Sequence, residues 1–407
     1  MPMPVRDLMR AINRAKVIEI IRTSGLISRV DLAASSGLSK ASVTGVTSDL
    51  IKEGLIIEKK SGEYEGGRRP MLLSLNPDGA YVIGVNLSIS EISVVIMNLA
   101  ADILATANQP LKEQCYSVEE ITDLMIKTVQ SCMWDGSFSK DKISGVGIAV
   151  PGPVYGNSGV IRFLPNYGWE NVNLKDHIEE KLGLPCYIDN SSNTLAAAER
   201  WYGEGKGVDN FLVVTLLNGV GLGIVINGHL YRGAAGIAGE FGHTTFAKNG
   251  PLCRCGKNGC IESYAGMISL LRDAKIAAKA GKWQAKNPEN ITFDDLIEEL
   301  KNDTPVIHEI FSEAGKVLGQ GISNLVALFN PSRIIVTGTA VRAGEYLIQP
   351  LKDSLADHTA NMCGPVEDLI FVQEWSDKQW ARGAGSLVLQ ELYKSPVSML
   401  PIGQHVG

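Results

Sequence analysis

The sequence has no long uninterrupted hydrophobic segment. Seven charged residues divide the first 25 residues, so no apolar core of a secretory signal is present. The most apolar stretch, residues 211–228, contains Asn218 and four glycines, a composition that favours two buried strands and a turn over a membrane span. We therefore expect a cytoplasmic protein without a membrane-inserted segment.

Cysteine is scarce and unevenly placed. Three of the seven cysteines, Cys253, Cys255 and Cys260, lie within eight residues of one another, and the total is odd. This distribution argues against a disulfide framework and favours a metal cluster in a reducing compartment.

The chain also lacks a strong net charge. A formal charge of -6 over 407 residues argues against a general polyanion binder. The charge is uneven, however, because residues 1–70 hold twelve Lys and Arg against eight Asp and Glu, whereas the remainder holds 26 against 36. A basic segment on an acidic body is typical of a nucleic-acid module joined to another function. The length indicates two to four domains.

Residues 1–76 are predicted to form a winged helix-turn-helix. Apolar residues at helical spacing indicate a first helix that ends at Gly25. Ser28 and Ser39 are the expected N-caps of a second and a third helix, and Gly54 ends the third. Helices in this order place the third where it can enter a major groove of DNA.

Two strands are expected next, at residues 55–60 and 71–75, and they enclose a Gly-Gly-Arg-Arg-Pro wing. Small, hydroxyl-bearing side chains on the third helix would allow close approach to base edges, and the wing arginines would reach a minor groove or phosphates. The alternative is a small helical protein-interaction domain with a charged hairpin. The expected DNA contacts are Ser39, Lys40, Ser42, Thr44, Thr47, Arg68 and Arg69.

From residue 80 the pattern becomes α/β. Strands are predicted at 81–87, 91–97 and 143–150 and a helix over 117–132, and strands and helices alternate again from residue 211. Two similar α/β halves with a cleft between them are indicated. We place the first lobe at 77–190, completed by a C-terminal helix near 377–395, and the second at 191–376.

Two segments carry a resemblance to a known family. Residues 236–243, Gly-Ile-Ala-Gly-Glu-Phe-Gly-His, and residues 253–262, Cys-Arg-Cys-Gly-Lys-Asn-Gly-Cys-Ile-Glu, resemble the G-x-x-G-E-x-G-H and C-x-C-G-x-x-G-C-x-E segments of the ROK family. Residues 219–223 and 329–331 also match in place. This family contains sugar kinases and sugar-responsive repressors, and the N-terminal module resembles that of the xylose-repressor and N-acetylglucosamine-repressor branch. The resemblance implies a two-lobed, actin-like sugar-kinase fold for the body.

Three thiolates and one imidazole suit a tetrahedral Zn²⁺ ion with no open position for chemistry. The resemblance implies a structural zinc on this set, and the alternative is three redox-active or inert surface cysteines. The expected ligands are His243, Cys253, Cys255 and Cys260.

A pyranose presents a ring of hydroxyls, so its recognition needs several hydrogen-bonding groups aimed into a small cleft. The carboxylates could instead be solvated, Asn166 could shape a turn, and Gly152 favours an explanation by backbone geometry. The segment 164–169 is most similar to that of xylose-repressor and glucokinase-type members, which favours an unsubstituted sugar. The sugar contacts that the resemblance implies are Gly152, Asn166, Asn190, Glu240, His243 and Glu262.

The groups that kinase members use are missing. Ser191 stands where the family's kinases carry the aspartate that accepts the hydroxyl proton, and residues 86–90 lack the aspartate and the glycine pair of the phosphate loop. We therefore expect that the protein is not an enzyme. Its body would be a sugar sensor that has lost kinase catalysis. The alternatives are a bifunctional or genuine ATP-dependent sugar kinase, or a scaffold that binds another protein.

The predicted function is repression of carbohydrate uptake or metabolism genes. A homodimer or homotetramer would read a palindromic double-stranded operator, and a small sugar effector would close the lobes and change the positions of the DNA-binding heads. A regulatory protein partner is a further possibility. The sugar, the operator and the roles of residues 278–290 and 397–407 stay unassigned.

Overall fold

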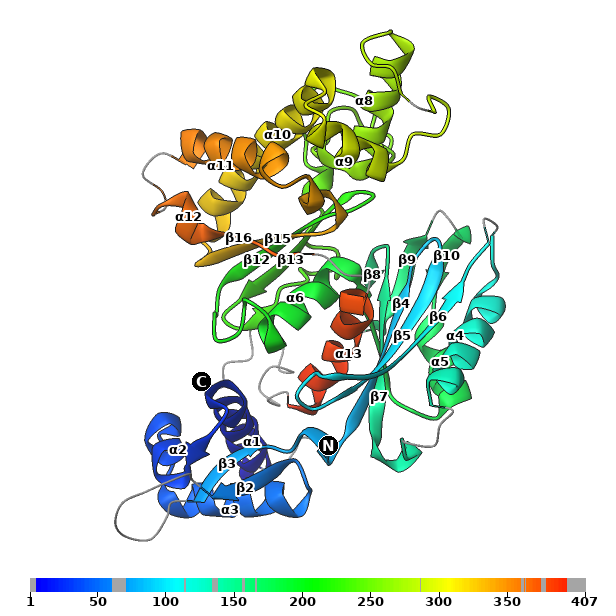
Figure 1. Cartoon of the computed structure of the whole chain (residues 1–407). Coiled ribbons are helices and arrows are strands. Elements are labelled where there is room, and N and C mark those ends of the chain that lie inside the picture. The colour runs from blue at the N-terminus through cyan, green and yellow to red at the C-terminus, as the bar shows by residue number, and fades with distance from the viewer. Residues whose placement is uncertain are drawn as a thin grey trace. The chain divides into compact units, whose positions relative to one another are not determined.

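The computed structural model describes residues 5–60, 71–112, 115–133, 138–155, 158–164, 167–285, 287–359, 362, 364–374 and 378–393 (Figure 1). The chain divides into a first unit, Met1–Pro153, Gly159–Ser191 and Trp380–Gly407, and a second unit, Val154–Ser158 and Ser192–Gln379. Residues 1–76, which were expected as a separate domain, lie within the first unit, so this division in two does not test the three expected domains. Among the described residues, no helix is long and apolar enough to cross a membrane.

The N-terminal module of the first unit contains three helices and a small antiparallel sheet of strand order β1-β3-β2. The expected helices and strands are all found. Their bounds are α1 (Val5–Ser24), β1 (Ile27–Ser28), α2 (Arg29–Ser36), α3 (Lys40–Lys52), β2 (Ile56–Lys60) and β3 (Met71–Leu75). The wing at residues 61–70, with Arg68 and Arg69, lies outside the described residues.

Local signals fix the ends of these helices. The Ser28 side chain accepts a hydrogen bond from the Asp31 amide, and the Ser39 side chain accepts one from the Ser42 amide, as the two predicted N-caps require. Gly37 adopts a left-handed conformation with a φ of 67° and turns the chain between α2 and α3. The turn between the two helices is therefore encoded by residues within it.

Two ion pairs join α1 to α3 and to the C-cap residue that follows α3. Arg10 Nη2 lies 2.6 Å from Asp49 Oδ2, and Arg14 Nη1 lies 2.6 Å from Glu53 Oε2. Beneath them, the apolar faces of the three helices form one core, with Ile18, Ile21, Leu32, Val43 and Leu50 fully buried. The helices thus form one packed module.

The α/β part of the first unit has a five-stranded sheet of order β11-β7-β4-β5-β6. Its three central strands are buried almost without interruption, whereas the edge strand β6 alternates between partly buried and exposed residues. Continuous burial means that both sheet faces are covered. The strands are β4 (Tyr81–Leu87), β5 (Glu91–Asn98), β6 (Ile103–Pro110), β7 (Ile143–Val150) and β11 (Cys186–Asn190), and the short strands are β8 (Val154–Tyr155), β9 (Val160–Leu164) and β10 (Trp169–Val172).

Helices α4 (Val118–Cys132) and α5 (Leu174–Leu182) cover one face of this sheet, and α13 (Lys378–Leu392) covers the other (Figure 1). Ser117 and Glu120 form a capping box at the start of α4. The approach of α13 is close, because a Cβ atom at Gly84 or Gly147 would overlap the carbonyl oxygen of Ala381 or Ala384. Backbone therefore packs against backbone at this contact.

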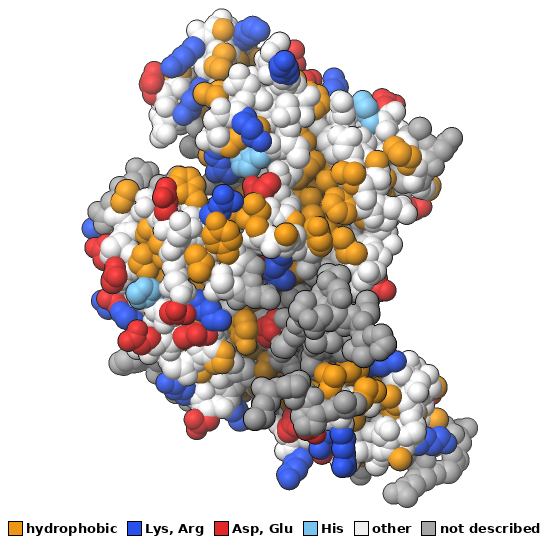
Figure 2. All heavy atoms as spheres, turned by 180° about the vertical axis from the view of Figure 1, so that it is seen from behind, with side chains coloured by type: hydrophobic (Ala, Val, Ile, Leu, Met, Phe, Trp, Pro, Cys, Tyr) orange, Lys and Arg blue, Asp and Glu red, His pale blue; other side chains and the backbone are white. Residues whose placement is uncertain are grey.

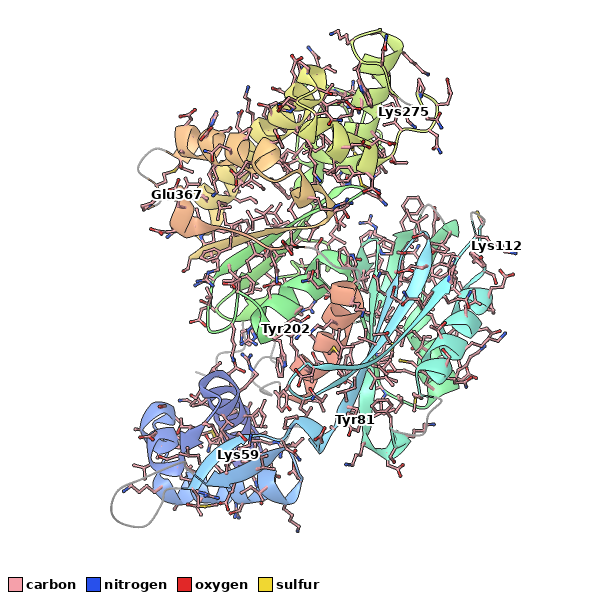
Figure 3. All side chains as sticks on the ribbon, in the orientation of Figure 1. Lys59, Tyr81, Lys112, Tyr202, Lys275 and Glu367 are labelled. Atoms are coloured by element: carbon pink, nitrogen blue, oxygen red, sulfur yellow. The ribbon has the colours of Figure 1, made fainter. Side chains whose placement is uncertain are left out.

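The second unit has a five-stranded sheet of order β14-β13-β12-β15-β16, with α6 on one face and α10 and α11 on the other (Figure 1). Figure 3 marks Tyr202 at the end of α6, Lys275 on α8 and Glu367 on α12. The strands are β12 (Phe211–Leu216), β13 (Val220–Ile226), β14 (His229–Leu230), β15 (Arg333–Thr337) and β16 (Ile370–Val372). The helices are α6 (Ser191–Tyr202), α7 (Glu262–Ala265), α8 (Met267–Lys279), α9 (Phe293–Lys301), α10 (Pro305–Phe329), α11 (Glu345–Thr359) and α12 (Val366–Leu369).

The contact between α13 and the sheet predicts a measurable effect of one methyl group. Gly147→Ala should lower the free energy of unfolding by roughly 1–3 kcal/mol, because the new Cβ must displace the backbone of α13. A thermal melt followed by circular dichroism checks this. The control is Gly45→Ala in α3, where no atom lies within 4 Å of the new Cβ and helix propensity favours alanine. Equal melting temperatures for the two variants would contradict the packing argument.

Candidate functional site

The segment from residue 245 to residue 260 folds back on itself. Isolated bridges pair Thr245 with Cys260 and Leu252 with Asn258. Within the turn, the Cys253 amide donates to the Lys257 carbonyl at 2.8 Å and the Gly256 amide donates to the Cys253 carbonyl at 2.9 Å. Gly256 has a φ of 85°, a conformation that glycine adopts without strain. This turn brings the three cysteine side chains to one side.

The four expected metal ligands meet in one cluster. The donor atoms of His243, Cys253, Cys255 and Cys260 all lie within 4.8 Å of one another. Cys255 Sγ and Cys260 Sγ are 3.7 Å apart, and Cys253 Sγ lies 3.5 Å from His243 Nδ1. Tetrahedral coordination with ordinary Zn–S and Zn–N bonds requires about 3.8 Å and about 3.6 Å for such pairs. The donor set therefore fits a tetrahedral metal ion.

The environment of the thiols determines how they ionise. Burial raises the pKa of Cys253 to about 12, and burial also raises the pKa of Cys260. Although burial opposes ionisation of Cys255 as well, the backbone amide of Lys257 and the neighbouring thiols stabilise its thiolate and lower its pKa. Binding of a metal must release the protons of Cys253 and Cys260, so acid pH disfavours it.

The two ring nitrogens of His243 face different groups. Its Nδ1 faces Cys253, while its Nε2 lies 3.9 Å from Glu240 Oε2. The pKa of Glu240 is raised, chiefly because the carboxyl is buried. The nearby His243 lowers this pKa, and the negative charge of Glu262 raises it further. His243 is thus placed to serve the metal cluster with one nitrogen and the carboxylate region with the other.

Glu262 begins α7 and is buried. Its Oε1 accepts a hydrogen bond from Arg254 Nε at 2.6 Å, and its Oε2 accepts one from Arg254 Nη2 at 3.0 Å and one from the Val220 amide at 3.1 Å. Sequence reasoning missed Arg254, since nothing in the sequence distinguishes the residue between two cysteine ligands. Glu240, His243 and Glu262, three of the predicted sugar contacts, all lie in the second unit.

Two other predicted sugar contacts lie in the first unit, at the carboxyl ends of adjacent parallel strands. Asn190 ends β11 and is the register partner of Val150, and Gly152 follows β7 by two residues. A Cβ at Gly152 would lie 2.8 Å from the Phe163 carbonyl oxygen, so backbone packing accounts for this glycine. Asn166 lies outside the described residues.

Ser191 and the turn at residues 86–90, the expected base and phosphate-loop positions, form hydrogen bonds within the protein. Ser191 donates a hydrogen bond to the Val150 carbonyl at 3.0 Å. In the turn between β4 and β5, Ser88 Oγ accepts hydrogen bonds from the Ser90 amide at 3.3 Å and the Glu91 amide at 3.0 Å. Two backbone amides that could face a phosphate are therefore already bonded to a side chain.

The exposed face of α3 carries Lys40, Ser42 and Thr44, which were expected there, and Ser39 caps the helix beside them. Thr47 lies elsewhere: its side chain is fully buried and accepts a hydrogen bond from Arg29 Nε at 3.2 Å. We no longer expect Thr47 to contact a base, because a buried side chain cannot reach one. The exposed residue one position further along α3 is Ser48.

Figure 2 shows Lys and Arg side chains interspersed with Asp and Glu over the face that it draws. On this face, charges of both signs are mixed. Recognition of DNA would rest on the local chemistry of α3 and the wing.

Three N-terminal helices with a small antiparallel sheet, two five-stranded sheets covered by helices, and a cluster of three cysteines and one histidine that could hold a metal ion define an α/β protein with an added N-terminal module. The chain belongs to the ROK family, whose profile matches residues 82–391. The matched residues span the α/β body, and the N-terminal module precedes them.

Three relatives illustrate this membership. The xylose repressor of Caldicellulosiruptor bescii is 34% identical over 354 residues, which cover 85% of this chain and 88% of the relative. The solved structure of a ROK family transcriptional regulator, a homologue of the Escherichia coli MLC protein, has a TM-score of 0.82 and 25% identity, and covers 97% of this chain and 99% of that one. A ROK family glucokinase from Streptomyces griseus, solved with glucose and AMPPNP, has a TM-score of 0.66 and 29% identity, and covers 76% and 99%.

The cluster geometry predicts how a cysteine variant behaves. Cys255→Ser should lose most of its bound metal and melt at a lower temperature, because an alcohol is a poor ligand for the ion and the turn at residues 253–260 then loses its crosslink. Elemental analysis and a thermal melt of the purified protein check this. Cys115→Ser is the matched control, since Cys115 is exposed and outside the cluster. Equal metal content in the two variants would contradict the assignment.

Proposed function

We propose that this protein is a sequence-specific transcriptional repressor of carbohydrate uptake or metabolism genes, and that a sugar bound to its α/β body controls its affinity for operator DNA. The N-terminal module would read a palindromic site as part of a homodimer or homotetramer, because a two-fold symmetric site matches a two-fold symmetric protein. A protein partner could act on the same equilibrium.

The observation that carries this proposal is the extent of the similarity. The glucokinase aligns over 99% of its own length but only 76% of this chain, whereas the transcriptional regulator aligns over 97% of this chain. The part that the kinase leaves uncovered is comparable in size to the helix-turn-helix module. A domain that kinases do without, and that a regulator shares, points to regulation of transcription.

The state of the kinase positions supports a sensor without catalysis. A serine hydroxyl such as that of Ser191 cannot act as a general base near neutral pH without activation. The turn at Ser88 offers no glycine-rich cradle, and Ile89 with its bulky side chain stands where backbone must approach a phosphate. The carboxylates that suit sugar hydroxyls are meanwhile retained.

Zn²⁺ is the metal that the Cys₃His donor set suits best. His243, Cys253, Cys255 and Cys260 would hold it, and with four protein ligands the ion would be structural rather than catalytic. Bound there, it would fix the segment that carries Glu240, His243 and Glu262. Loss of zinc would accordingly weaken sugar binding as well as local folding.

In this mechanism the sugar acts by binding two conformations of the repressor unequally. In the second unit, Glu240 and Glu262 accept hydrogen bonds from sugar hydroxyls, and His243 Nε2 exchanges one with a hydroxyl. The family resemblance adds Asn190 and Asn166 as expected donors and acceptors. The conformation favoured by the sugar has the lower affinity for the operator. Linkage then requires that operator DNA weakens sugar binding by the same factor.

The second candidate is a sugar kinase, favoured by the similarity to the ATP-dependent glucokinase fold. A coupled ATP assay over hexoses and pentoses separates the two. Turnover that Asn190→Ala abolishes would establish the kinase, and absence of turnover in a protein that still binds a sugar agrees with the sensor.

The exposed face of α3 predicts a change in the salt dependence of DNA binding. If Lys40 contacts one phosphate, Lys40→Ala should reduce the slope of log affinity against log salt by about 0.9, because one fewer counterion is released. Fluorescence anisotropy with an operator selected from a random DNA pool measures it. Lys279→Ala, an exposed lysine at the end of α8, serves as the control and should leave the slope unchanged. Equal slopes for Lys40→Ala and the wild type would remove Lys40 from the interface.

The sensor proposal predicts selective stabilisation by a sugar. At a concentration about 100 times its dissociation constant, the effector should stabilise the fold by roughly 2.7 kcal/mol. A thermal-shift screen of the full chain over unsubstituted and phosphorylated sugars, with and without ATP·Mg²⁺, measures this. One sugar acting alone, with ATP adding nothing, is the expected result. Stabilisation by ATP would revive the kinase, and no response to any sugar would sink the effector part of the proposal.

A further inference from the structure

The carboxylate of Glu262 is almost fully engaged within the protein. Arg254 donates two parallel hydrogen bonds to this carboxylate, from Nε to Oε1 and from Nη2 to Oε2, and the Val220 amide donates a third to Oε2. The Glu262 side chain is 5% exposed, whereas the Arg254 side chain is 55% exposed. The exposed guanidinium of Arg254 therefore binds the buried carboxylate of Glu262 in a bidentate geometry, which fixes the orientation of the carboxylate.

The number of hydrogen bonds limits what Glu262 can still accept. A carboxylate offers about four acceptor positions, and Arg254 and the Val220 amide take three of them. The Cys253 thiol lies 3.8 Å from Oε1 and donates to the fourth while it keeps its proton. Ionised as a metal ligand, Cys253 has no proton to donate, and about one acceptor position on Oε1 is then left. Two neighbouring hydroxyls could not each bond to Glu262 while Arg254 stays in place. The pair of residues thus selects a single hydroxyl donor.

The surroundings are shaped for this ion pair. A Cβ atom at Gly219 would overlap both the Glu262 carboxylate and the Arg254 guanidinium, so the glycine before β13 leaves the space that the pair fills. The same turn supplies the Val220 amide. Three separate segments, residues 219–220, residue 254 and residue 262, converge on one carboxylate.

Arg254 also lies between two of the clustered cysteines. The turn that places Cys253 and Cys255 fixes the backbone on both sides of Arg254, and with it the direction from which the guanidinium reaches Glu262. The orientation of Glu262 therefore depends on the folded turn.

We propose that Arg254 is a positioning and specificity-determining residue for the sugar effector, which acts by holding Glu262 in one orientation with one acceptor position open to a single hydroxyl. This inference rests on the proposed function, in which Glu262 binds sugar. Arg254 itself forms no bond to the sugar. Without Arg254, Glu262 is free to turn and regains acceptor positions, so both affinity and discrimination between deoxy sugars fall.

The test is a double-mutant cycle in the metal-loaded full chain, with the sugar that stabilises the wild type and its monodeoxy analogues as probes. Arg254→Met should weaken binding of the sugar at least about tenfold and should flatten the differences among the analogues. Arg254→Lys should recover part of the affinity and little of the discrimination, because an ammonium group cannot form the fork. In a Glu262→Gln background, Arg254→Met should cause little further loss.

Two controls separate this role from general damage. Arg342→Met removes a comparable half-exposed arginine, paired with Asp294 at 2.7 Å in the same unit, and should leave sugar binding unchanged. Metal content should stay equal in all variants. Wild-type affinity and discrimination in Arg254→Met, or losses that simply add in the double variant, would overturn the proposal.

If the wild type binds no sugar in the panel, the positioning of Glu262 by Arg254 can still be tested by thermal melts. That result ends the effector part of the proposed function, and the melting temperatures of the same four proteins then test the positioning. Arg254→Met should lower the melting temperature because it leaves a buried carboxylate without its partner, and Glu262→Gln should restore part of it. A melting cycle without coupling would show that Arg254 does not position Glu262.

Discussion

The meeting of His243 with three cysteines is the constraint on which the surrounding segment, residues 236–262, depends. The segment between residues 236 and 262 has little regular secondary structure, so backbone ladders cannot fix its side chains. One cluster of four donors takes over that task. It determines where His243 presents its second nitrogen and from which side Arg254 reaches Glu262. A metal ion held by these four donors would crosslink the segment, in place of a sheet or a helix.

The features that could be predicted from the sequence are those set by nearby residues. Ser28 and Ser39 act as caps within three residues of their partners, and the cysteine spacing places three ligands in one turn. The alternation of strands and helices likewise indicated an α/β body, and the stretch at residues 211–228 forms β12 and β13 as expected. Each of these signals lies within about a dozen residues, where spacing alone specifies geometry.

The contacts that could not be predicted from the sequence have a different cause. The polar side chain of Thr47 suggests exposure, but with Val43, Val46 and Leu50 it completes a stripe at helical spacing and is buried. Arg254 was overlooked because its partner becomes visible only in three dimensions. No pattern in the sequence indicates that Ser88 Oγ accepts hydrogen bonds from the Ser90 and Glu91 amides of its own turn. Burial and pairing of polar groups depend on tertiary packing, which a pattern of residue types does not encode.

The position of α13 has a consequence for how the molecule is made. This helix completes the first unit, lying against Gly84 and Gly147, yet it follows the whole of the second unit along the chain. During synthesis, one apolar face of the first sheet stays uncovered until α13 has been translated, after the whole of the second unit. The N-terminal module and the second unit can fold earlier from their own residues. A ribosome that stops short of α13 therefore releases a chain with a finished DNA-binding module and an unfinished sheet, a natural substrate for chaperones and proteases.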